Sequence, residues 1–321
     1  MPMHLITGGA GFVGVNLARR LLASGERIVV VDDLSRGQRA FLREFDRSPL
    51  FSFVQLDCAD AEAFINGIRS LDAGSIDEIW HLAANSDIPG GVADPSVDLN
   101  RTFMTTFATL VLMRDLAIPV LHFASSSAVY GDLKDAAISE LSGPPEPISN
   151  YGAMKLASEA QIRAAVESFL KRANIFRFPN VIGLPATHGV LLDLVRKARR
   201  TPSGFDVLGD GTQQKIYLHV DDLVDAMLRI RERAAGGYNV FNIGPADEGV
   251  TVREIAEAVR DRVAPRATIR FGTGDRGWVG DVPRFRYDIG KLASLGWRPT
   301  MDSKAAIKRA VEQVAAQESG T

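Results

Sequence analysis

A glycine-rich loop at residues 8–14 restricts the possible folds of this chain more than any other segment. The apolar run 3–7 predicts a buried strand before it, and residues 15–22 have helical apolar spacing after it. Glycines between a strand and a helix let the backbone approach a pyrophosphate, which then faces the amides at the helix N-terminus. The loop therefore predicts a dinucleotide-binding βαβ unit.

An acidic residue follows the next apolar run and supports this prediction. Residues 27–31 predict a second strand, and Asp32 ends it about 20 residues past the loop, where an acid binds the adenosine ribose. A carboxylate there repels a 2′-phosphate, which favours NAD over NADP, although the nearby Arg36 favours the reverse. The alternative is a glycine-rich turn without a ligand, but strand, loop, helix and acid all agree with a dinucleotide site.

Apolar strands and amphipathic helices continue to alternate along the chain. Further strands are predicted at 51–56, 78–82, 120–125 and 174–178, and helices at 97–116 and 151–170. This rhythm predicts a parallel sheet covered on both faces, with ligands bound outside the carboxyl ends of its strands. Five candidate residues each follow a predicted strand: Gly8, Asp32, Asp57, Ala83 and Ser126.

The rhythm breaks after residue 178, which predicts a second lobe. Predicted there are a helix at 190–200, strands at 216–220 and 238–243 around a helix at 221–233, and a capping box at 251–254. The expected fold is a Rossmann-type doubly wound parallel sheet (α/β) with a smaller, discontinuous C-terminal α/β lobe. The NAD-binding domain would comprise 1–178 plus about 216–244, and the second lobe 179–215 and 245–321.

Composition fits an enzyme with a large core. The 321 residues are 46% hydrophobic and carry a net charge of −2, without a bias towards nucleic acid or anionic membranes. No apolar run approaches the roughly 20 residues that cross a bilayer, and the first strand leaves no room for a signal peptide. The lone Cys58 fits a reducing compartment, so we expect a cytoplasmic protein. His188 and His219 lack metal-ligand spacing, and no metal is predicted.

Tyr151 and Lys155 lie one helical turn apart at the start of a predicted helix. A tyrosine with its ordinary pKa near 10 is a poor base, but an ammonium on the same helix face and an oxidised nicotinamide would favour the phenolate. A phenolate can take an alcohol proton as hydride leaves the same carbon. Ser126, at a strand end, could bond the same oxygen. We therefore predict Ser126, Tyr151 and Lys155 as catalytic, the alternative being a surface Tyr/Lys pair.

From residue 3 to about 300 the chain resembles the extended short-chain dehydrogenase/reductases, in their nucleotide-sugar epimerase/dehydratase family. The resemblance rests on segments 7–14, 32–35, 57, 81–84, 125–131, 151–155, 177–183, 209–213 and 280–282. It implies NAD as cofactor, a nucleotide-diphosphate sugar as substrate of the second lobe, and a homodimer through the helices around 98–116 and 151–170.

The resemblance also implies roles for single residues. Those expected to bind the cofactor are Gly8, Gly11, Phe12, Val13, Gly14, Asp32, Asp33, Ser35, Asp57, Cys58, Leu82, Ala83, Ala84, Tyr151 and Lys155. Those expected to bind the substrate are Ser126, Ser127, Asn180, Lys215, Arg276 and Asp281. Lys215 stands where the family usually has an arginine, and a lysine offers a point charge in place of a bidentate fork.

The residues after Ser126 help to sort the family's reactions. Dehydratases have an Asp-Glu pair there and decarboxylases a Glu at the second position, whereas this chain has Ser127 and Ala128. The pattern is similar to the 4-epimerases: Tyr151 takes the proton of the sugar C4 hydroxyl, hydride passes to NAD, the 4-keto sugar turns over, and hydride returns to its other face. Alternatives are a dehydratase, a reductase, an epimerase at another carbon, or a non-catalytic NAD-binding regulatory protein, for which the intact Ser126, Tyr151 and Lys155 would be unnecessary.

Overall fold

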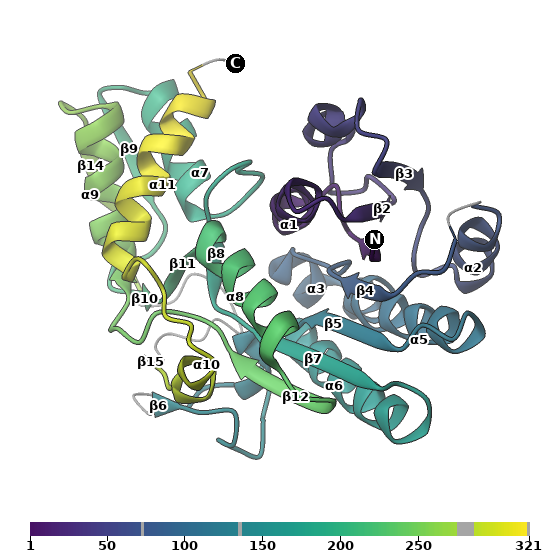
Figure 1. Ribbon diagram of the computed structural model, residues 1–321. Helices are drawn as coiled ribbons and strands as arrows, with labels where there is room; N and C mark the ends of the chain where they lie inside the picture. The colour runs from purple at the N-terminus through teal and green to yellow at the C-terminus, as the bar shows by residue number, and fades with distance from the viewer. Residues whose placement is uncertain (72–73, 134–136, 275–285, 320–321) are drawn as a thin grey trace. The chain divides into compact units, whose positions relative to one another are not determined.

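The structure is a computed structural model that describes residues 1–71, 74–133, 137–274 and 286–319 (Figure 1). The chain forms two compact units. The first unit consists of Met1–Gly131, Pro145–Arg177 and Met227–Phe241, and the second of Asp132–Pro144, Phe178–Ala226 and Asn242–Thr321. Each unit therefore gathers segments that are distant in sequence. The predicted assignment of cofactor and substrate to two domains, with its boundaries, stays a prediction.

A seven-stranded sheet forms the centre of the first unit, in the order β12-β7-β5-β4-β1-β2-β3. Its strands are β1 (Met3–Thr7), β2 (Arg27–Asp32), β3 (Phe51–Gln55), β4 (Glu78–His81), β5 (Val120–Ala124), β7 (Arg172–Arg177) and β12 (Gly237–Asn242). The pairs β1–β2, β2–β3, β1–β4, β4–β5 and β5–β7 are parallel. The order reverses between β1 and β4, so the predicted doubly wound Rossmann-type sheet is confirmed.

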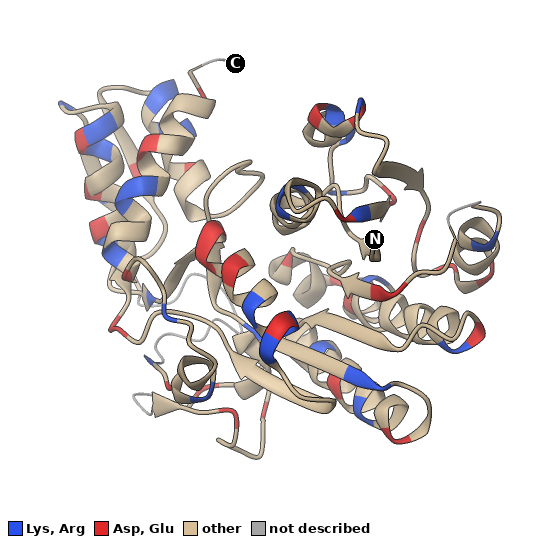
Figure 2. Cartoon of the chain, in the orientation of Figure 1, with Lys and Arg blue, Asp and Glu red and all other residues tan. Residues whose placement is uncertain are grey.

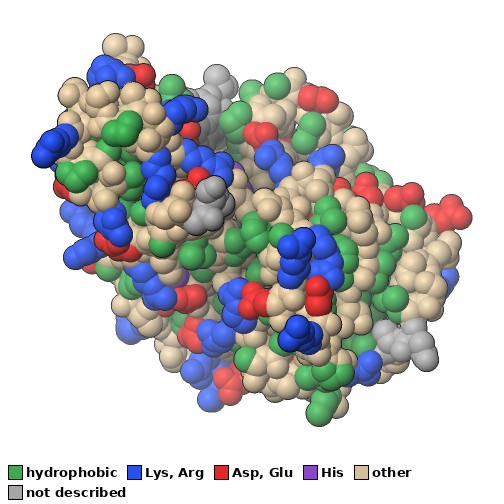
Figure 3. Space-filling view, turned by 90° about the horizontal axis from the view of Figure 1, so that it is seen from above, with side chains coloured by type: hydrophobic (Ala, Val, Ile, Leu, Met, Phe, Trp, Pro, Cys, Tyr) green, Lys and Arg blue, Asp and Glu red, His purple; other side chains and the backbone are tan. Residues whose placement is uncertain are grey.

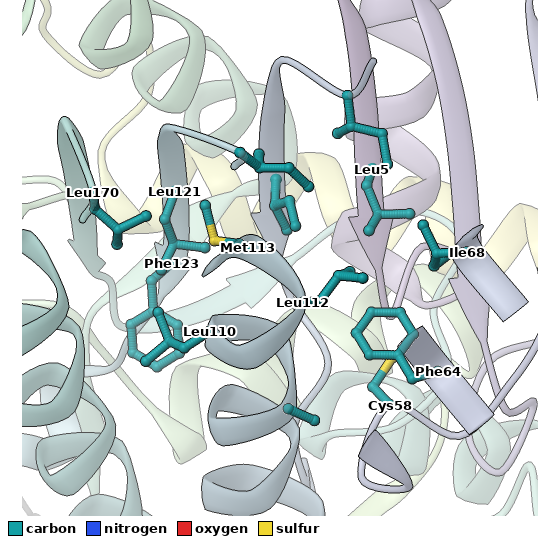
Figure 4. Close-up of a cluster of buried hydrophobic side chains, with 14 of the residues drawn as sticks. Leu5, Cys58, Phe64, Ile68, Leu110, Leu112, Met113, Leu121, Phe123 and Leu170 are labelled. Atoms are coloured by element: carbon teal, nitrogen blue, oxygen red, sulfur yellow. The ribbon is translucent and has the colours of Figure 1, made fainter. Parts of the chain in front are cut away.

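Helices cover this sheet because their apolar faces bury a continuous cluster against the strands. The α-helices are α1 (Phe12–Ala23), α2 (Ala61–Arg69), α3 (Ile88–Ala93), α4 (Pro95–Asp98), α5 (Thr105–Asp115) and α6 (Asn150–Ser168). Short 3₁₀ helices are η1 (Arg39–Phe45) and η3 (Ser127–Tyr130). Figure 4 shows side chains of α5 facing those of β5 inside the cluster, with Leu110 and Met113 opposite Leu121 and Phe123.

The predicted helix at 97–116 is present, but it is not uniform. It begins as α4, continues through a π-helical segment η2 (Leu99–Met104) and ends as α5. A π-helical turn often marks a functional site. Threonine hydroxyls bond to backbone carbonyls along this stretch, as between Thr105 Oγ1 and Thr102 O at 2.9 Å. The sequence periodicity predicts the helix but not this change of hydrogen bonding.

The second unit has its own core, built around three helices: α7 (Val190–Arg200), α9 (Val252–Val263) and α11 (Ser303–Gln317). Short paired strands surround them: β6 (Ala137–Ile138), β8 (Asn180–Ile182), β9 (Gly204–Val207), β10 (Gln214–Lys215), β11 (Tyr217–His219), β13 (Val250–Thr251), β14 (Thr268–Phe271) and β15 (Arg286–Tyr287). The short helix α10 (Gly290–Ser294) precedes α11, and α8 (Val220–Arg233) passes from the second unit into the first. The predicted capping box is confirmed at Thr251 and Glu254.

Figure 2 shows that many of the charged residues lie on helices and that both signs occur along the chain. Both signs are intermixed on the face seen in Figure 3, as the net charge of −2 would suggest. Among the helices that the structure describes, none has the length and apolar character needed to cross a membrane.

One partly buried charged network connects β1, β4 and β5 to α8 in the first unit. Arg231 of α8 donates to Glu78 and to Glu26, each at 2.7 Å, and the fully buried rings of His4 and His122 bond to these carboxylates. Burial lowers the pKa of His122 to about 4, although its hydrogen bond to the Glu78 carboxylate raises the pKa. Burial raises the pKa of Glu78, but His122 and Arg231 outweigh it and hold the value at about 2.

We expect this network to make the protein unstable in acid. Folded His122 binds fewer protons than the unfolded chain between pH 6.5 and about 4, and folded Glu78 binds fewer between pH 4.5 and about 2. The free energy of unfolding should therefore decrease as the pH is lowered through both windows. The decrease is about 1.4 kcal/mol per pH unit for each fully titrating group. Urea unfolding at pH 7, 5.5 and 4.5 measures it. The His122→Gln variant should show a shallower slope, and equal slopes would contradict this account.

Candidate active site

The glycine loop links β1 to α1 and has the geometry of an anion cradle. Gly8 has a positive φ of 69°, which favours glycine, and the N-cap of α1 is Gly11. No side chain caps this helix, and its first turn has no acidic residue. The N-cap residue therefore gives no side-chain hydrogen bond to the first amides of α1. The loop and these amides fit the pyrophosphate of a dinucleotide.

We expect Gly14→Ala to lose the dinucleotide. A Cβ at Gly14 would lie 2.5 Å from the Cα of Gly9 and 2.6 Å from the carbonyl oxygen of Gly8, so the loop must shift. Absorbance of the nucleotide extracted from purified protein measures the loss. The control is Gly236→Ala, where the nearest atom would be 3.6 Å away. Cofactor content equal to wild type in the Gly14 variant would contradict the proposed role of the loop.

Asp32 ends β2 and braces the same loop. Its Oδ2 accepts from the amide of Ala10 at 3.0 Å, and its Oδ1 accepts from the amide of Leu34 at 2.9 Å. Burial raises the pKa of this carboxyl, against both hydrogen bonds. Arg36, which alone would favour a 2′-phosphate, is paired with Asp87 at 2.6 Å. The local arrangement therefore agrees with a preference for NAD.

The other residues predicted to bind the cofactor follow the neighbouring strands of the first unit. Asp33 Oδ1 accepts from the amide of Ser35 at 2.8 Å, and Asp57 Oδ1 accepts from the amide of Ala59 at 2.8 Å. Cys58 lies beside Phe64 in the hydrophobic cluster of Figure 4. Its burial raises the pKa of the thiol. These roles in cofactor binding stay predictions.

The segment 82–84 follows β4, next to the glycine loop that follows β1. A Cβ at Gly8 would lie 2.7 Å from the amide nitrogen of Ala83, so the two segments touch at the point where the strand order reverses. His81 is fully buried just before it and bonds to Thr7 at 2.7 Å and Thr106 at 3.1 Å. Burial lowers the pKa of His81 to about 3, so it is a neutral residue that supports this backbone.

Ser126, Tyr151 and Lys155 lie together at the carboxyl end of β5. Ser126 caps η3, and its Oγ accepts from the amide of Ala128 at 3.1 Å. Ser149 caps α6 in the same way, which places Tyr151 and Lys155 in the first two turns of that helix. The Lys155 ammonium lies 5.8 Å from the centre of the Tyr151 ring, and Ser126 hydrogen-bonds to Tyr151. The three predicted catalytic residues are therefore neighbours.

The protonation states differ from the expectation drawn from the sequence. Burial raises the pKa of Tyr151 to about 12, against the hydrogen bond from Ser126, so the phenol of the protein alone is protonated. Burial lowers the pKa of Lys155 to about 7, while the charges of Glu159 and Asp98 raise it. Burial is therefore the largest effect on the pKa of Tyr151, and the lowering expected from Lys155 together with an oxidised nicotinamide stays a prediction. Lys155 Nζ donates to the carbonyl of Ala124 at 2.5 Å, which fixes its position.

Sequence reasoning missed a buried ion pair behind these residues. Glu159 Oε2 accepts from Arg177 Nη2 at 2.5 Å, and Oε1 accepts from Arg177 Nε at 3.0 Å and from Ser125 Oγ at 2.5 Å. The pair ties α6 to the ends of β5 and β7. One signal was available, because Glu159 lies four residues beyond Lys155 and hence near the same helix face. Its partner Arg177 could not be inferred from that spacing.

The residues predicted to bind substrate are divided between the units. Ser127 begins η3 in the first unit, next to Ser126. Asn180 begins β8 with an exposed side chain, and Lys215 lies half-buried in β10, both in the second unit. Arg276 and Asp281 lie outside the described residues. Within the ranges that the structure describes, no three His, Cys, Asp or Glu side chains group as metal ligands.

Comparison with known proteins agrees with this site. The model of the NAD dependent epimerase/dehydratase family matches residues 4–244. The chain belongs to this family. Its membership confirms the predicted family and the predicted NAD cofactor. The matched residues include the glycine loop after β1 and the group of Ser126, Tyr151 and Lys155.

Individual relatives of this family member match over nearly the whole chain. The UDP-glucose 4-epimerase of Mycolicibacterium smegmatis is 31% identical and covers 96% of this chain and 97% of its own. A crystal structure of UDP-galactose 4-epimerase is 34% identical with a TM-score of 0.85, covering 98% and 99%. The dTDP-glucose 4,6-dehydratase DesIV of Streptomyces venezuelae, solved with NAD and TYD, is 27% identical with a TM-score of 0.85, covering 99% and 98%.

Proposed function

We propose that the protein is an NAD-dependent nucleotide-sugar 4-epimerase that keeps and recycles its cofactor. The observation that carries the proposal is the group of Ser126, Tyr151 and Lys155 at the end of β5, in the same unit as the glycine loop. The similarity to UDP-glucose and UDP-galactose 4-epimerases supports the same reaction class. A group that can accept a proton next to a dinucleotide is what oxidation of an alcohol requires.

Each residue of the group would have a defined task. Tyr151 would accept the proton of the C4 hydroxyl, and Ser126 would hold the same oxygen by a hydrogen bond. Lys155, fixed by its bond to Ala124, would place a positive charge beside the phenolate form of Tyr151, which is the form that can accept the proton. Residues Gly8, Gly11, Gly14 and Asp32 would hold NAD, which supplies the oxidation of C4 and its later reduction. Returning the proton from Tyr151 to the oxygen would complete the cycle.

A dehydratase is the second candidate, since DesIV is about as similar in structure. The Asp-Glu pair expected of dehydratases is replaced by Ser127 and Ala128. Neither side chain can serve as a general acid for the loss of water. This observation favours epimerisation over elimination.

The proposal is tested by incubating the purified protein, with no added cofactor, with UDP-, GDP-, ADP-, CDP- and dTDP-sugars. Anomeric protons are followed by NMR. A new signal for the C4 epimer of one sugar is the expected result, and it also shows that NAD is carried and recycled. A keto-deoxy product would contradict the proposal in favour of a dehydratase, and no change with any sugar would contradict it as well.

We further propose that two copies associate through η2, α5 and α6. Leu99 is 45% exposed and Phe107 is 38% exposed, large apolar side chains on consecutive parts of one helical stretch. Exposed apolar side chains on a helix face suit a partner surface. Sedimentation equilibrium should give the mass of two 34.8 kDa chains, and the mass of one chain would contradict the dimer.

The proposed location is the cytoplasm, supported by the single cysteine, Cys58, which is free and buried. Proteins of oxidising compartments more often use cysteines in pairs. Fractionation of cells that produce the protein should recover it with cytoplasmic markers, and recovery with secreted proteins would contradict this location.

A further inference from the structure

A second buried carboxylate lies near the Tyr/Lys pair. Asp98, the last residue of α4, is fully buried. Its Oδ1 accepts from the side-chain amide of Asn85 at 2.8 Å, and its Oδ2 has no hydrogen-bond partner within the described residues. A buried carboxylate with only one neutral donor is costly, because its charge is not compensated. Such a residue suggests a function that requires the charge.

The surrounding backbone holds Asp98 in place. A methyl group at Gly91 would overlap Oδ2 of Asp98, so only glycine allows the carboxylate to lie there. The carbonyl oxygen of Gly91 accepts from Asn150 Nδ2 at 2.8 Å. Asn150 directly precedes Tyr151 at the start of α6. One short segment therefore packs against the carboxylate and also anchors the helix that carries Tyr151 and Lys155.

The charge of Asp98 reaches both residues of the pair. It raises the pKa of Lys155 and the pKa of Tyr151, and Lys155 in turn lowers the pKa of Asp98 against the effect of burial. The other carboxylate that acts on Lys155 is Glu159, which Arg177 neutralises by two hydrogen bonds. Asp98 is paired with no arginine in the part of the chain that the structure describes.

The remaining charged groups around Asp98 come from the segment before α3. Asp87 also raises the pKa of Asp98, but its own carboxylate is paired with Arg36 at 2.6 Å. Asn85, the only side chain bonded to the Asp98 carboxylate among the described residues, is neutral. On the side of Lys155 that faces Asp98, the electrostatic potential is therefore determined mainly by the Asp98 carboxylate.

We propose that Asp98 is a positioning residue of this site, whose buried carboxylate holds Lys155 as an ammonium ion and opposes early ionisation of Tyr151. This inference rests on the proposed function for its kinetic consequence, but its electrostatic part concerns the protein with NAD alone. Asp98 does not accept the substrate proton. It acts through Lys155 and Tyr151, and so sets the pH range in which Tyr151 can ionise to the phenolate that accepts the proton while Lys155 is still an ammonium ion.

The test is the variant Asp98→Asn, which keeps an oxygen for Asn85 and removes the charge. We expect both limbs of the pH profile of kcat/KM to move to lower pH, by on the order of one pH unit. The ultraviolet absorbance of the phenolate in NAD-saturated protein, with the Tyr151→Phe variant as blank, should show a matching shift for Tyr151. Asp115→Asn, at the exposed end of α5, removes a charge elsewhere and should move neither readout.

A variant that loses activity while both limbs and the phenolate titration stay at the wild-type pH would overturn the inference, because Asp98 would then be structural. If Asp98→Asn does not fold, Asp98→Ser removes the same charge and is held to the same two readouts. The phenolate titration needs no sugar, so it tests Asp98 even if the sugar panel contradicts the 4-epimerase. Normal epimerisation with unmoved limbs would overturn the role of Asp98 alone.

Discussion

Replacing Tyr151 by Phe is expected to lower turnover by about 1,000-fold while NAD stays bound, because general acid–base groups typically contribute at this scale. The ring, its packing and the contact with Lys155 at 5.8 Å remain, and only the oxygen that bonds Ser126 is lost. The rate of sugar conversion by NMR and the nucleotide extracted from the same sample measure the two effects separately.

The matched control for this change is Tyr238→Phe. Tyr238 lies in the same unit, and its hydroxyl donates to the carbonyl of Glu159 at 3.3 Å without being in the Ser-Tyr-Lys group. The Tyr238→Phe variant should convert sugar at close to the wild-type rate. Wild-type turnover in the Tyr151 variant would rule out the phenol as the proton acceptor.

Replacing Glu159 by Ala is expected to lower the free energy of unfolding by about 3–5 kcal/mol, since removing one partner of a buried ion pair leaves the other charge uncompensated. Arg177 would remain buried, with a side chain only 7% exposed, and Ser125 would lose its acceptor. Urea unfolding at neutral pH measures the loss. Activity should fall too, because the pair joins α6 to β5 and β7 beside Lys155.

The same helix offers a control for the loss of a glutamate. Glu167 pairs with Arg163 at 3.2 Å, but its side chain is 69% exposed. An exposed pair of this kind contributes about 0.5 kcal/mol or less, so Glu167→Ala should be nearly neutral. Glu159→Gln keeps an oxygen for Arg177 and should lie between the two. Equal losses at Glu159 and Glu167 would contradict the buried pair as a main support of the site.

Local patterns in the sequence were sufficient for the sheet and the loop. The glycine spacing of 8–14, the apolar runs and Asp32 each report on a few consecutive residues, and the structure has the strands where these runs lie. The helix at 190–200 and the capping box at Thr251 follow from local rules as well, and both are confirmed. The π-helical part of 97–116 does not follow from such rules, because the apolar periodicity of the sequence is the same for either backbone hydrogen-bonding pattern.

The residues that the sequence did not reveal depend on contacts between distant segments. Asp98 meets Asn85, and Glu159 meets Arg177, across separations of 13 and 18 residues. The protonation of Tyr151 was predicted from its helical neighbour Lys155, whereas burial decides it and places the pKa at about 12. Spacing identifies which groups are close, but burial sets their charge, and burial is a property of the folded chain.

The central claim is that oxidation and reduction take place at one carbon, C4, with a cofactor that never leaves. The most direct test uses the nucleotide sugar identified by the panel, prepared with deuterium at C4 and incubated with the protein without added NAD. We expect mass spectrometry and NMR to find the epimer with deuterium retained at C4. Loss of the deuterium to solvent would contradict the claim.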